Sequence, residues 1–364
     1  MNQVLVELST MPFLRNLYNK GEWNCQKAGG LSMHKRHVKI EGIGKYLPQR
    51  MVTDEELDIR LNVSRGWVRK KTDVARRYFA ENETAVQMGA KAAYSALEAA
   101  GLSFNDIDCL VCTSGTMEQP IPCTASLIQK EMGQEKSGVP SFDINSTCLS
   151  FVTGLDVMSY MVHAGRYRRV LLVATEIASK GINWLDKESA SLFGDGAAAV
   201  VLKQSAPGEV SQILHASMQT FSSGAHLSEI RGGGSKRHAS EYSSSTATDY
   251  LFDMNGEGIF RMAYKLLPDF VKQLMAPTGS QISDFRIVIP HQGSAMAMRL
   301  LRRKLGISEE QLMYITPDHG NTIAASIPMG IYEAVRQGRM TRGDRVLLLG
   351  TSAGVSLGGV ILDY

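Results

Sequence analysis

The sequence predicts an α/β protein built from two similar halves. Continuous apolar runs such as VLLVAT (170–175) alternate with segments of helical period, a pattern typical of buried strands covered by helices on both faces. The run Arg169–Thr175 (RVLLVAT) reappears as Arg345–Thr351 (RVLLLGT), and each copy precedes a glycine-rich connection and a last apolar strand. Such a duplication places matched elements around a pseudo-dyad, where we expect a shared site.

Composition is typical of a globular protein. The 364 residues are 44% hydrophobic and 21% charged, which allows a sizeable core and two halves or domains. The net charge of +3, with both signs interspersed, argues against a nucleic-acid or membrane-surface partner. No apolar stretch approaches the roughly 18 residues of a membrane span. The odd number of cysteines, five, favours a reducing cytoplasm over a disulfide framework.

Residues 1–37 are predicted to form an N-terminal extension. They are weakly patterned, end in the basic cluster His34–His37 and lack the apolar core of a signal peptide. We interpret them as a frayed extension or as residues before a later start at Met33, with a short lid or partner-binding arm as the alternative. The N-terminal half is then expected over 38–210 and the C-terminal half over 211–364.

Regular elements are expected from Val38 onward. In the first half, strands are predicted at 38–43, 108–113, 139–144, 170–175 and 198–202, and helices from Asp54, at 84–100, at 124–132 and from 149. A turn is expected over Gly44–Pro48. Cys109 and Cys112, three residues apart in one strand, face opposite sides of it, which argues against a metal pair or a disulfide between them.

Two segments have two interpretations each. Ser64–Tyr78 is basic and contains Trp67, which suits either a phosphate-bearing ligand beside an aromatic platform or an ordinary solvated helix face. Phe221–Thr248, between the halves, is rich in glycine and serine, as in a flexible linker or a mobile loop at the mouth of a site. Its GGGSK run lacks the spacing of a phosphate-binding loop.

Cys148 carries the strongest chemical signal. The strand at 139–144 leads into it, and the apolar residues after it recur at helical spacing until Gly165. At a helix start, unpaired N–H groups and the positive dipole end favour a thiolate, the form that attacks an acyl carbon. Because a lone cysteine is more often a small buried hydrophobic residue, this interpretation depends on partners elsewhere in the chain.

Two later motifs supply such partners. The strand Phe285–Pro290 ends directly in His291, at a position where α/β sheets usually place chemistry. The loop His319–Thr322 carries Asn321 before another small-residue helix, and this region and Cys148 fall at equivalent helix starts in the duplication. Cysteine, histidine and asparagine together suit thioester chemistry, as nucleophile, proton handler and oxyanion donor. Singly, each partner is also explained by structural or turn chemistry.

Several motifs occur in a fixed order between Val38 and Tyr364. They are GIGKYLP with VT (42–53), the Trp67 segment, the turn around Cys148, FGDGAAAVVL (193–202), GGGS (232–235), PHQ (290–292) and HGNT (319–322). This ordered set resembles the β-ketoacyl-acyl-carrier-protein synthase III family. The resemblance implies a thiolase-like fold, in which two duplicated βαβαβαββ halves form a five-layered α-β-α-β-α core. It also implies a cytoplasmic acyltransferase of fatty-acid, secondary lipid or polyketide biosynthesis, without a cofactor.

The resemblance assigns roles to the catalytic candidates. Cys148 takes an acyl group from acyl-CoA. His291 and Asn321 then stabilise the enolate formed when a malonyl thioester loses CO2, and the carbanion attacks the acyl group to give a β-ketoacyl product. The backbone N–H groups of Cys148 and Gly354 form the oxyanion hole. No metal is implied, because neutral donors hold the enolate.

The resemblance also implies binding residues and partners. Lysines stand at two CoA-binding positions where the family has arginines. The CoA-binding set is Trp67, Lys71, Lys187 and Ser294, and the set that docks an acyl carrier protein is Arg261, Arg303 and Lys304. A homodimer formed through the central sheet is expected, with no nucleic-acid partner and no membrane insertion.

Three alternatives remain. A non-decarboxylating condensation of two acyl-CoA chains uses an additional glutamate base, but Ile121 and Pro122 stand near its position, with Glu118 three residues away. Acyl transfer to an oxygen or nitrogen acceptor would use Cys148 without decarboxylation. A non-enzymatic scaffold is the alternative from a different class, and the intact catalytic set argues against it.

Overall fold

The structure is a computed structural model that describes residues 35–364. The interpretations placed on residues 1–34, including a start at Met33, lie outside the described residues. The described residues belong to one compact unit. None of their helices combines the length and apolarity of a membrane-spanning segment.

The first sheet is built from strands of the N-terminal half. Its order is β1 (Val38–Tyr46), β7 (Gly196–Gln204), β6 (Arg169–Glu176), β4 (Cys109–Cys112) and β5 (Ser141–Asp143). β6, β4 and β5 run parallel, and β7 is antiparallel to both of its neighbours. Two helices cover the outer face, α5 (Ala85–Ala100), which begins with a capping box at Thr84, and α6 (Thr124–Glu131).

The second sheet is built from strands of the C-terminal half. Its order is β11 (Ile287–Pro290), β12 (Arg345–Ser352), β13 (Ser356–Asp363) and β8 (Gln212–Thr220). Its outer face is covered by α9 (Gly256–Met275) and α10 (Ala295–Leu305). The counterpart of β5 is reduced to a single parallel bridge between Val288 and Leu312.

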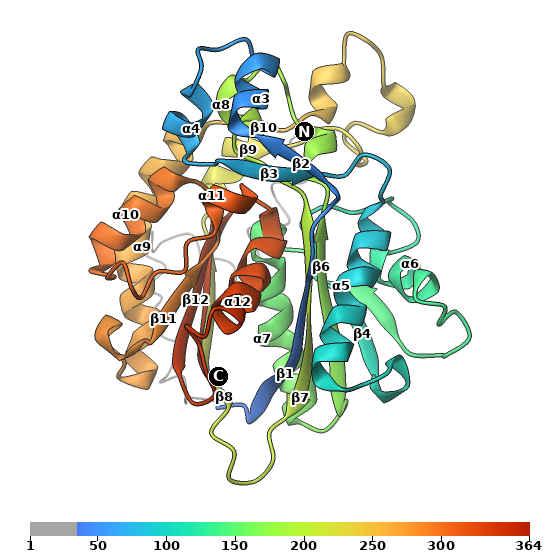
Figure 1. The fold of residues 1–364 in the computed structure, drawn as a ribbon, viewed down its shortest axis with the longest axis vertical. Helices are drawn as coiled ribbons and strands as arrows, with labels where there is room; N and C mark the ends of the chain where they lie inside the picture. Colours follow the sequence, from blue (N-terminus) through green and yellow to red (C-terminus); the bar gives the residue numbers. More distant parts are fainter. Residues whose placement is uncertain (1–34) are drawn as a thin grey trace, which may run out of the picture. The chain divides into compact units, whose positions relative to one another are not determined.

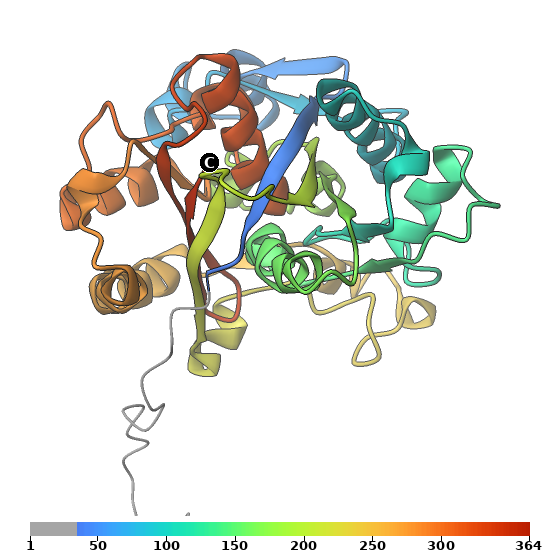
Figure 2. The ribbon, with the colours of Figure 1, turned by 90° about the horizontal axis from the view of Figure 1, so that it is seen from below.

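Two helices fill the space between the sheets. α7 (Ser150–His163) and α12 (Ser326–Arg336) contact each other and strands of both sheets, and the apolar residues around them form the largest core cluster. The layers therefore follow the order helix, sheet, helix, sheet, helix, as Figures 1 and 2 show. This arrangement confirms the predicted five-layered α/β fold.

Strand register makes the duplication explicit. Cys109 pairs with Val170 in the first sheet, and Ile287 pairs with Val346 in the second. The matched positions after these strands make the same backbone bond: Thr113 N–H to the Val173 carbonyl at 2.7 Å, and His291 N–H to the Leu349 carbonyl at 2.8 Å. The division of the chain at residues 210 and 211 stays a prediction.

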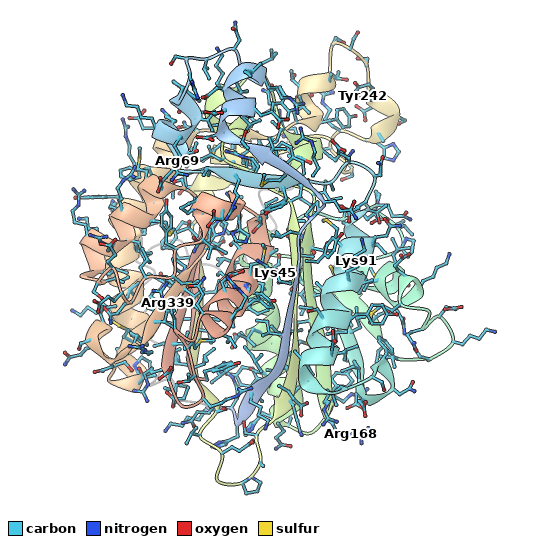
Figure 3. The ribbon with its side chains drawn as sticks, in the orientation of Figure 1. Lys45, Arg69, Lys91, Arg168, Tyr242 and Arg339 are labelled. Atoms are coloured by element: carbon cyan, nitrogen blue, oxygen red, sulfur yellow. The ribbon has the colours of Figure 1, made fainter. Side chains whose placement is uncertain are left out.

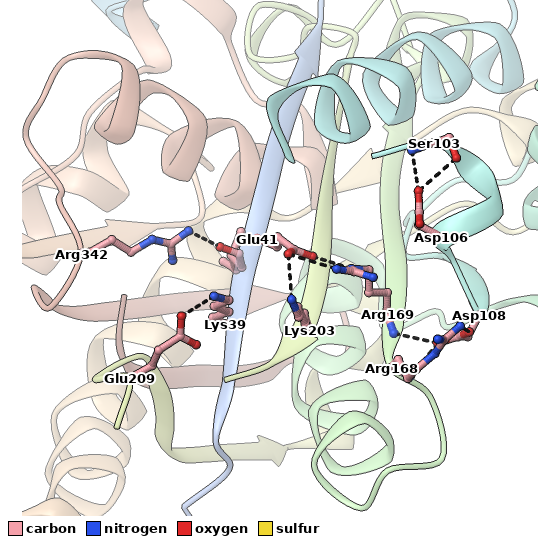
Figure 4. A network of polar contacts seen from close by, with 11 residues as sticks. Lys39, Glu41, Ser103, Asp106, Asp108, Arg168, Arg169, Lys203, Glu209 and Arg342 are labelled. Carbon is pink, nitrogen blue, oxygen red and sulfur yellow. Dashed lines mark hydrogen bonds and ion pairs between the residues drawn. The ribbon is translucent and has the colours of Figure 1, made fainter. Parts of the chain in front are cut away.

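A cap covers one end of the sheets. It contains β2 (Arg50–Thr53), α3 (Asp54–Arg60), α4 (Trp67–Thr72), β3 (Arg76–Phe79), α8 (Lys187–Ala190) and α11 (Thr316–His319). The opposite end of the first sheet carries a charged network (Figure 4), in which Glu41 of β1 binds Arg169 of β6 at 2.7 Å and Lys203 of β7 at 3.2 Å. This network ties three strands together away from the cap.

Three local predictions need correction. Gly44–Tyr46 belongs to β1 and is not a turn, because pairing with Ala197–Ala199 extends the strand. The strand expected at 139–144 is reduced to β5, three residues long. Phe221–Thr248 is not a free linker. Its first turn packs on α9, and β9 (Ser228–Glu229) within it pairs with β10 (Asp253–Met254), which follows the segment.

Candidate functional site

A cavity of about 780 Å³ brings the three predicted catalytic residues together. Cys148, His291 and Asn321 all line it, although they lie far apart in the sequence and come from both halves. The cavity lies where matched strand ends of the two sheets meet. The predicted site on the pseudo-dyad therefore corresponds to a cavity of suitable size for a small-molecule substrate.

Local hydrogen bonds hold the turn that carries Cys148. The cysteine lies in the 3₁₀ turn η4 (Thr147–Leu149), directly before α7, and Thr147 adopts a left-handed φ of 55°. Asn145 Oδ1 accepts from Thr147 N–H at 2.8 Å, and Ser150 Oγ accepts from Ser146 N–H at 2.9 Å. These polar side chains support a backbone conformation that a β-branched residue rarely adopts.

The Cys148 thiol is not activated in the free protein. Burial and the nearby carboxyl of Glu176 raise the pKa of Cys148 to about 12, outweighing the backbone N–H groups of Ala353 and Cys148 that lower it. The expectation that the helix start favours a thiolate is therefore wrong for this state. The two N–H groups are nevertheless directed at the sulfur. The donor named from the sequence, Gly354, lies one residue beyond the group that faces Cys148.

His291 is a neutral ring held by Ser326. Its Nδ1 lies 2.8 Å from Ser326 Oγ at the start of α12, and burial lowers the pKa of His291 to about 4. A Cβ at Gly350 would lie only 3.0 Å from His291 Cβ, so glycine makes room for the ring. Buried Gln292 fixes the turn by accepting from Thr316 N–H at 3.2 Å. A hydrogen bond between the ring and the backbone of Ile323 offsets part of the lowering of the His291 pKa that burial causes.

The side-chain amide of Asn321 has one possible orientation. Its Oδ1 accepts from Ile323 N–H at 2.9 Å, so the NH2 group points the other way, toward the Gly293 carbonyl at 3.4 Å. The backbone is fixed by Asn321 N–H bonding the Leu192 carbonyl at 2.8 Å. Gly320, with φ of 67°, allows this close approach of the HGNT and FGDG segments. The FGDG motif thus supports the asparagine.

Glu176 is a functional candidate that the sequence reasoning missed. It is fully buried at the end of β6 and accepts from Gly115 N–H at 2.5 Å, from Thr116 N–H at 3.0 Å and from Thr116 Oγ1 at 2.6 Å. The backbone of Ala324 donates to it as well, and burial raises the pKa of Glu176 to about 7. An acid that ends an apolar strand one residue after VLLVAT was the signal available in the sequence.

Sequence comparison identifies the relatives of this chain. Residues 142–222 match the family model of 3-oxoacyl-[acyl-carrier-protein] synthase III, and residues 275–364 match the model of its C-terminal part. The β-ketoacyl-[acyl-carrier-protein] synthase III of Acidiphilium cryptum is 33% identical over 326 residues, covering 89% of this chain and 98% of that protein. That of Neisseria meningitidis is 32% identical, covering 90% and 100%. The chain belongs to the β-ketoacyl-[acyl-carrier-protein] synthase III family.

Solved structures agree with this assignment. The synthase III of Aquifex aeolicus matches with a TM-score of 0.81 and 30% identity over 90% of this chain and all of that one. The priming β-ketosynthase of the R1128 polyketide pathway matches with a TM-score of 0.81, 27% identity and coverage of 90% and 96%. This chain is therefore an acyltransferase, a synthase that carries out a decarboxylating Claisen condensation in fatty-acid or polyketide biosynthesis.

The predicted CoA-binding residues of the synthase divide into two groups. Lys71 and Ser294 line the cavity, and Lys71 pairs with Glu188 at 2.5 Å on its rim. Trp67 and Lys187 are outside the lining. Trp67 is partly buried against the apolar cluster of the cap, and Lys187 donates to the Asn62 carbonyl at 3.3 Å.

The predicted carrier-docking residues lie close together on two helices. Arg261 is on α9, paired with Glu257, while Arg303 and Lys304 are on α10. The Lys304 ammonium lies 3.6 Å from the ring centroid of Tyr264 on α9, and Lys304 and Arg303 both lower the pKa of Tyr264. The three cations therefore form one basic patch on the outer helix layer.

His319, in the same loop as Asn321, belongs to a buried polar cluster. Lys45 Nζ, labelled in Figure 3, lies 3.2 Å from His319 Nε2 and 2.5 Å from Glu333 Oε1 on α12. His319 Nδ1 lies 3.0 Å from the Ile315 carbonyl, and burial, with Lys45, lowers the pKa of His319 to about 4. His319 is thus a structural support for the loop. Within residues 35–364, no cluster of His, Cys, Asp or Glu has the makeup of a metal site.

Proposed function

We propose that Cys148 is the acylated nucleophile of a two-step condensation. In the first step, the Cys148 sulfur attacks the thioester carbon of an acyl-CoA, the thiol proton leaves, and CoA departs as a thiol. The N–H groups of Cys148 and Ala353 stabilise the oxyanion formed on the carbonyl. The raised pKa of the free thiol means that deprotonation accompanies the attack and does not precede it.

In the second step, a malonyl thioester enters and loses CO2. The enolate oxygen that forms accepts hydrogen bonds from His291 Nε2 and from the NH2 group of Asn321, both neutral donors. This role requires the proton of the neutral ring on Nε2, with Ser326 Oγ donating to Nδ1, 2.8 Å away. The carbanion attacks the acyl carbon, the Cys148 thiolate leaves, and a β-ketoacyl thioester is released.

Substrates and partners follow from the same site and from the names of its relatives. The cation at the cavity rim, Lys71, suits the phosphates of CoA, and the basic patch of Arg261, Arg303 and Lys304 suits an acidic carrier protein. We expect a homodimer that acts in the cytoplasm, with no cofactor beyond its thioester substrates. The non-decarboxylating alternative gains no support, because Glu118 binds Val86 N–H at 2.7 Å and lies outside the cavity lining.

The observation that carries this proposal is the convergence of a thiol, an imidazole and an amide on one cavity, with two N–H groups at the sulfur. The test is release of labelled CO2 from malonyl thioesters in the presence of acyl-CoA primers. We expect primer-dependent release that is lost in Cys148→Ala and kept in Cys123→Ala, a matched change at another cysteine that is not fully buried. Acylation of Cys148 without CO2 release for any malonyl donor would leave acyl transfer as the function.

A further inference from the structure

Arg77 of β3 is a fully buried arginine that binds backbone carbonyls instead of a carboxylate. Its Nη1 donates to the Ser191 carbonyl and lies 3.5 Å from the Phe193 carbonyl oxygen. Nε and Nη2 have no hydrogen-bond acceptor in the part of the chain that the structure describes. Burial lowers the pKa of Arg77 to about 9, so the side chain still carries its charge at neutral pH. Such a charge is costly to the fold, and a neutral side chain of similar size would be cheaper to bury.

The carbonyls that Arg77 binds flank the carbonyl that holds Asn321. The Leu192 carbonyl, between them in the chain, accepts from Asn321 N–H at 2.8 Å. Gly194 N–H in turn donates to the Asn321 carbonyl at 3.1 Å, which completes a parallel bridge between the two segments. Residues 191–194 therefore lie between the buried guanidinium and the backbone of the catalytic asparagine.

The junction between these segments is tightly packed. A Cβ at Gly194 would lie 2.1 Å from the His319 carbonyl oxygen and 3.3 Å from Arg77 Cβ, so only glycine allows the FGDG and HGNT segments to approach this closely. Just before β3, Ala75 N–H donates to the Pro317 carbonyl at 2.8 Å, and α11 packs against β3. A packed junction of this kind transmits a shift of one segment to the other.

We propose that Arg77 is a positioning residue that holds Asn321 in place for the decarboxylation step. This inference rests on the proposed function, in which the Asn321 amide stabilises the enolate and takes no part in acylation of Cys148. Nη1 carries two N–H groups in one plane, so it serves both carbonyls in a fixed geometry that a flexible lysine ammonium does not reproduce. Without this contact the segment 191–194 can shift, and a displacement of Asn321 by about 1 Å is enough to slow the second step roughly 100-fold.

The test measures the two steps separately in single-turnover experiments. Intact-protein mass spectrometry follows acylation of Cys148, and labelled malonyl thioester added to the acylated protein reports CO2 release. Arg77→Met keeps most of the side-chain volume and removes the charge and the donors. CO2 release should fall about 10- to 100-fold while acylation stays within about threefold. Arg77→Lys, which keeps the charge, should release CO2 at a rate between those of the wild type and Arg77→Met.

A double-mutant cycle shows whether Arg77 acts through Asn321. Asn321→Ala alone removes the amide and should lower CO2 release. Adding Arg77→Met to Asn321→Ala should lower CO2 release by less than about threefold more, because the residue that Arg77 positions is already gone. The matched control is Arg76→Met, at the exposed neighbour on β3 that pairs with Asp318 at 2.9 Å, and it should leave both steps within about twofold of the wild type.

Stability separates positioning from a general loss of structure. Arg77→Met should unfold at the same temperature as the wild type or higher, because it removes an isolated buried charge. If this variant does not fold, Arg77→Lys takes its place in both experiments. Unchanged CO2 release in the Arg77 variants, equal slowing of both steps, or full additivity with Asn321→Ala would overturn the inference. Absence of CO2 release by the wild type from every malonyl donor would instead contradict the proposed function.

Discussion

Cys148 and Ala324 occupy matched positions at the starts of the two central helices, yet only one of them faces a substrate cavity. Each follows a residue in the left-handed region, Thr147 with φ of 55° and Ile323 with φ of 49°, and each lies in a 3₁₀ turn that leads into α7 or α12. Cys148 lines the cavity, whereas Ala324 is fully buried. The same strained turn has been kept in both halves and used differently.

The strand ends opposite the two turns explain the difference. Glu176 and Ser352 are matched last residues of β6 and β12. Glu176 accepts from the backbone N–H of Ala324, so a carboxyl group occupies the donor at the turn before α12. Ser352 Oγ instead donates to the Ser146 carbonyl at 2.8 Å, and the N–H of the next residue, Ala353, remains directed at the Cys148 sulfur. The carboxylate that ends β6 therefore accepts the backbone N–H groups near it, whereas the hydroxyl that ends β12 leaves the N–H of Ala353 directed at the Cys148 sulfur.

The largest expected effect comes from moving the thiol from one turn to the other. Cys148→Ala should lower condensation by at least roughly 1,000-fold, because no covalent intermediate forms. The double variant Cys148→Ala, Ala324→Cys should show no recovery, since Glu176 occupies the donors at that turn. Assays of CO2 release, with intact-protein mass spectrometry for acylation, check both. Acylation at position 324 would show that the two turns are equivalent in chemistry as well as in backbone.

His291 and Thr113 form a second matched pair, at the ends of β11 and β4. His291→Ala should lower malonyl decarboxylation by roughly 100- to 10,000-fold while Cys148 is still acylated, because the imidazole acts on the enolate. Thr113→Val, at the matched position in the other half, should change each step by less than about threefold. Separate single-turnover measurements of acylation and CO2 release distinguish the steps. Equal loss of both steps in His291→Ala would assign the histidine to acylation as well.

The difference between the two halves could be predicted from the sequence only where the residues involved lie close together along the chain. The RVLLVAT and RVLLLGT runs predicted the duplicated strands, and the family motifs predicted Cys148, His291 and Asn321, because each of these signals is local. The donor at the sulfur was assigned one residue too late, since the register of a turn is set by tertiary contacts. Ser326 and Glu176 were missed because their partners come from distant segments.

The C-terminal half contains two buried histidines, His291 and His319, and their pKa values predict how stability depends on pH. Burial lowers the pKa of His291 and of His319 to about 4, below the usual value near 6.5. Between these values the unfolded chain binds more protons at each histidine, which lowers stability by up to about 1.4 kcal/mol per pH unit for each ring as pH decreases from about 6.5 to 4. Glu176 and Asp195, with pKa values raised to about 7 and 6, bind protons in the folded protein and act in the opposite direction over part of this range. Urea unfolding across this range measures the slope.

A replacement at one of these histidines tests that assignment. His319→Gln removes one titrating ring and should change the slope of stability against pH by about one proton, toward greater stability at lower pH, whatever it does to stability at neutral pH. The variant His238→Gln changes an exposed histidine and serves as the control, with an unchanged slope. An unaltered slope in His319→Gln would show that His319 is protonated in the folded protein at a pH near its ordinary pKa.

The smallest expected effect concerns Glu176, the carboxyl that hydrogen-bonds the turn at Ala324 and also lies near Cys148. Above about pH 7, Glu176 is ionised and its charge raises the pKa of Cys148, whereas below about pH 6 it is neutral. Glu176→Gln removes the charge, so iodoacetamide should alkylate Cys148 about three- to tenfold faster than in the wild type above pH 7 and at a similar rate below pH 6. Asp195→Asn changes another buried carboxyl, whose pKa is raised to about 6, and should not alter this profile. Coinciding wild-type and Glu176→Gln profiles at every pH would mean that Glu176 acts on the turn through its hydrogen bonds alone and leaves the nucleophile electrostatically unaffected.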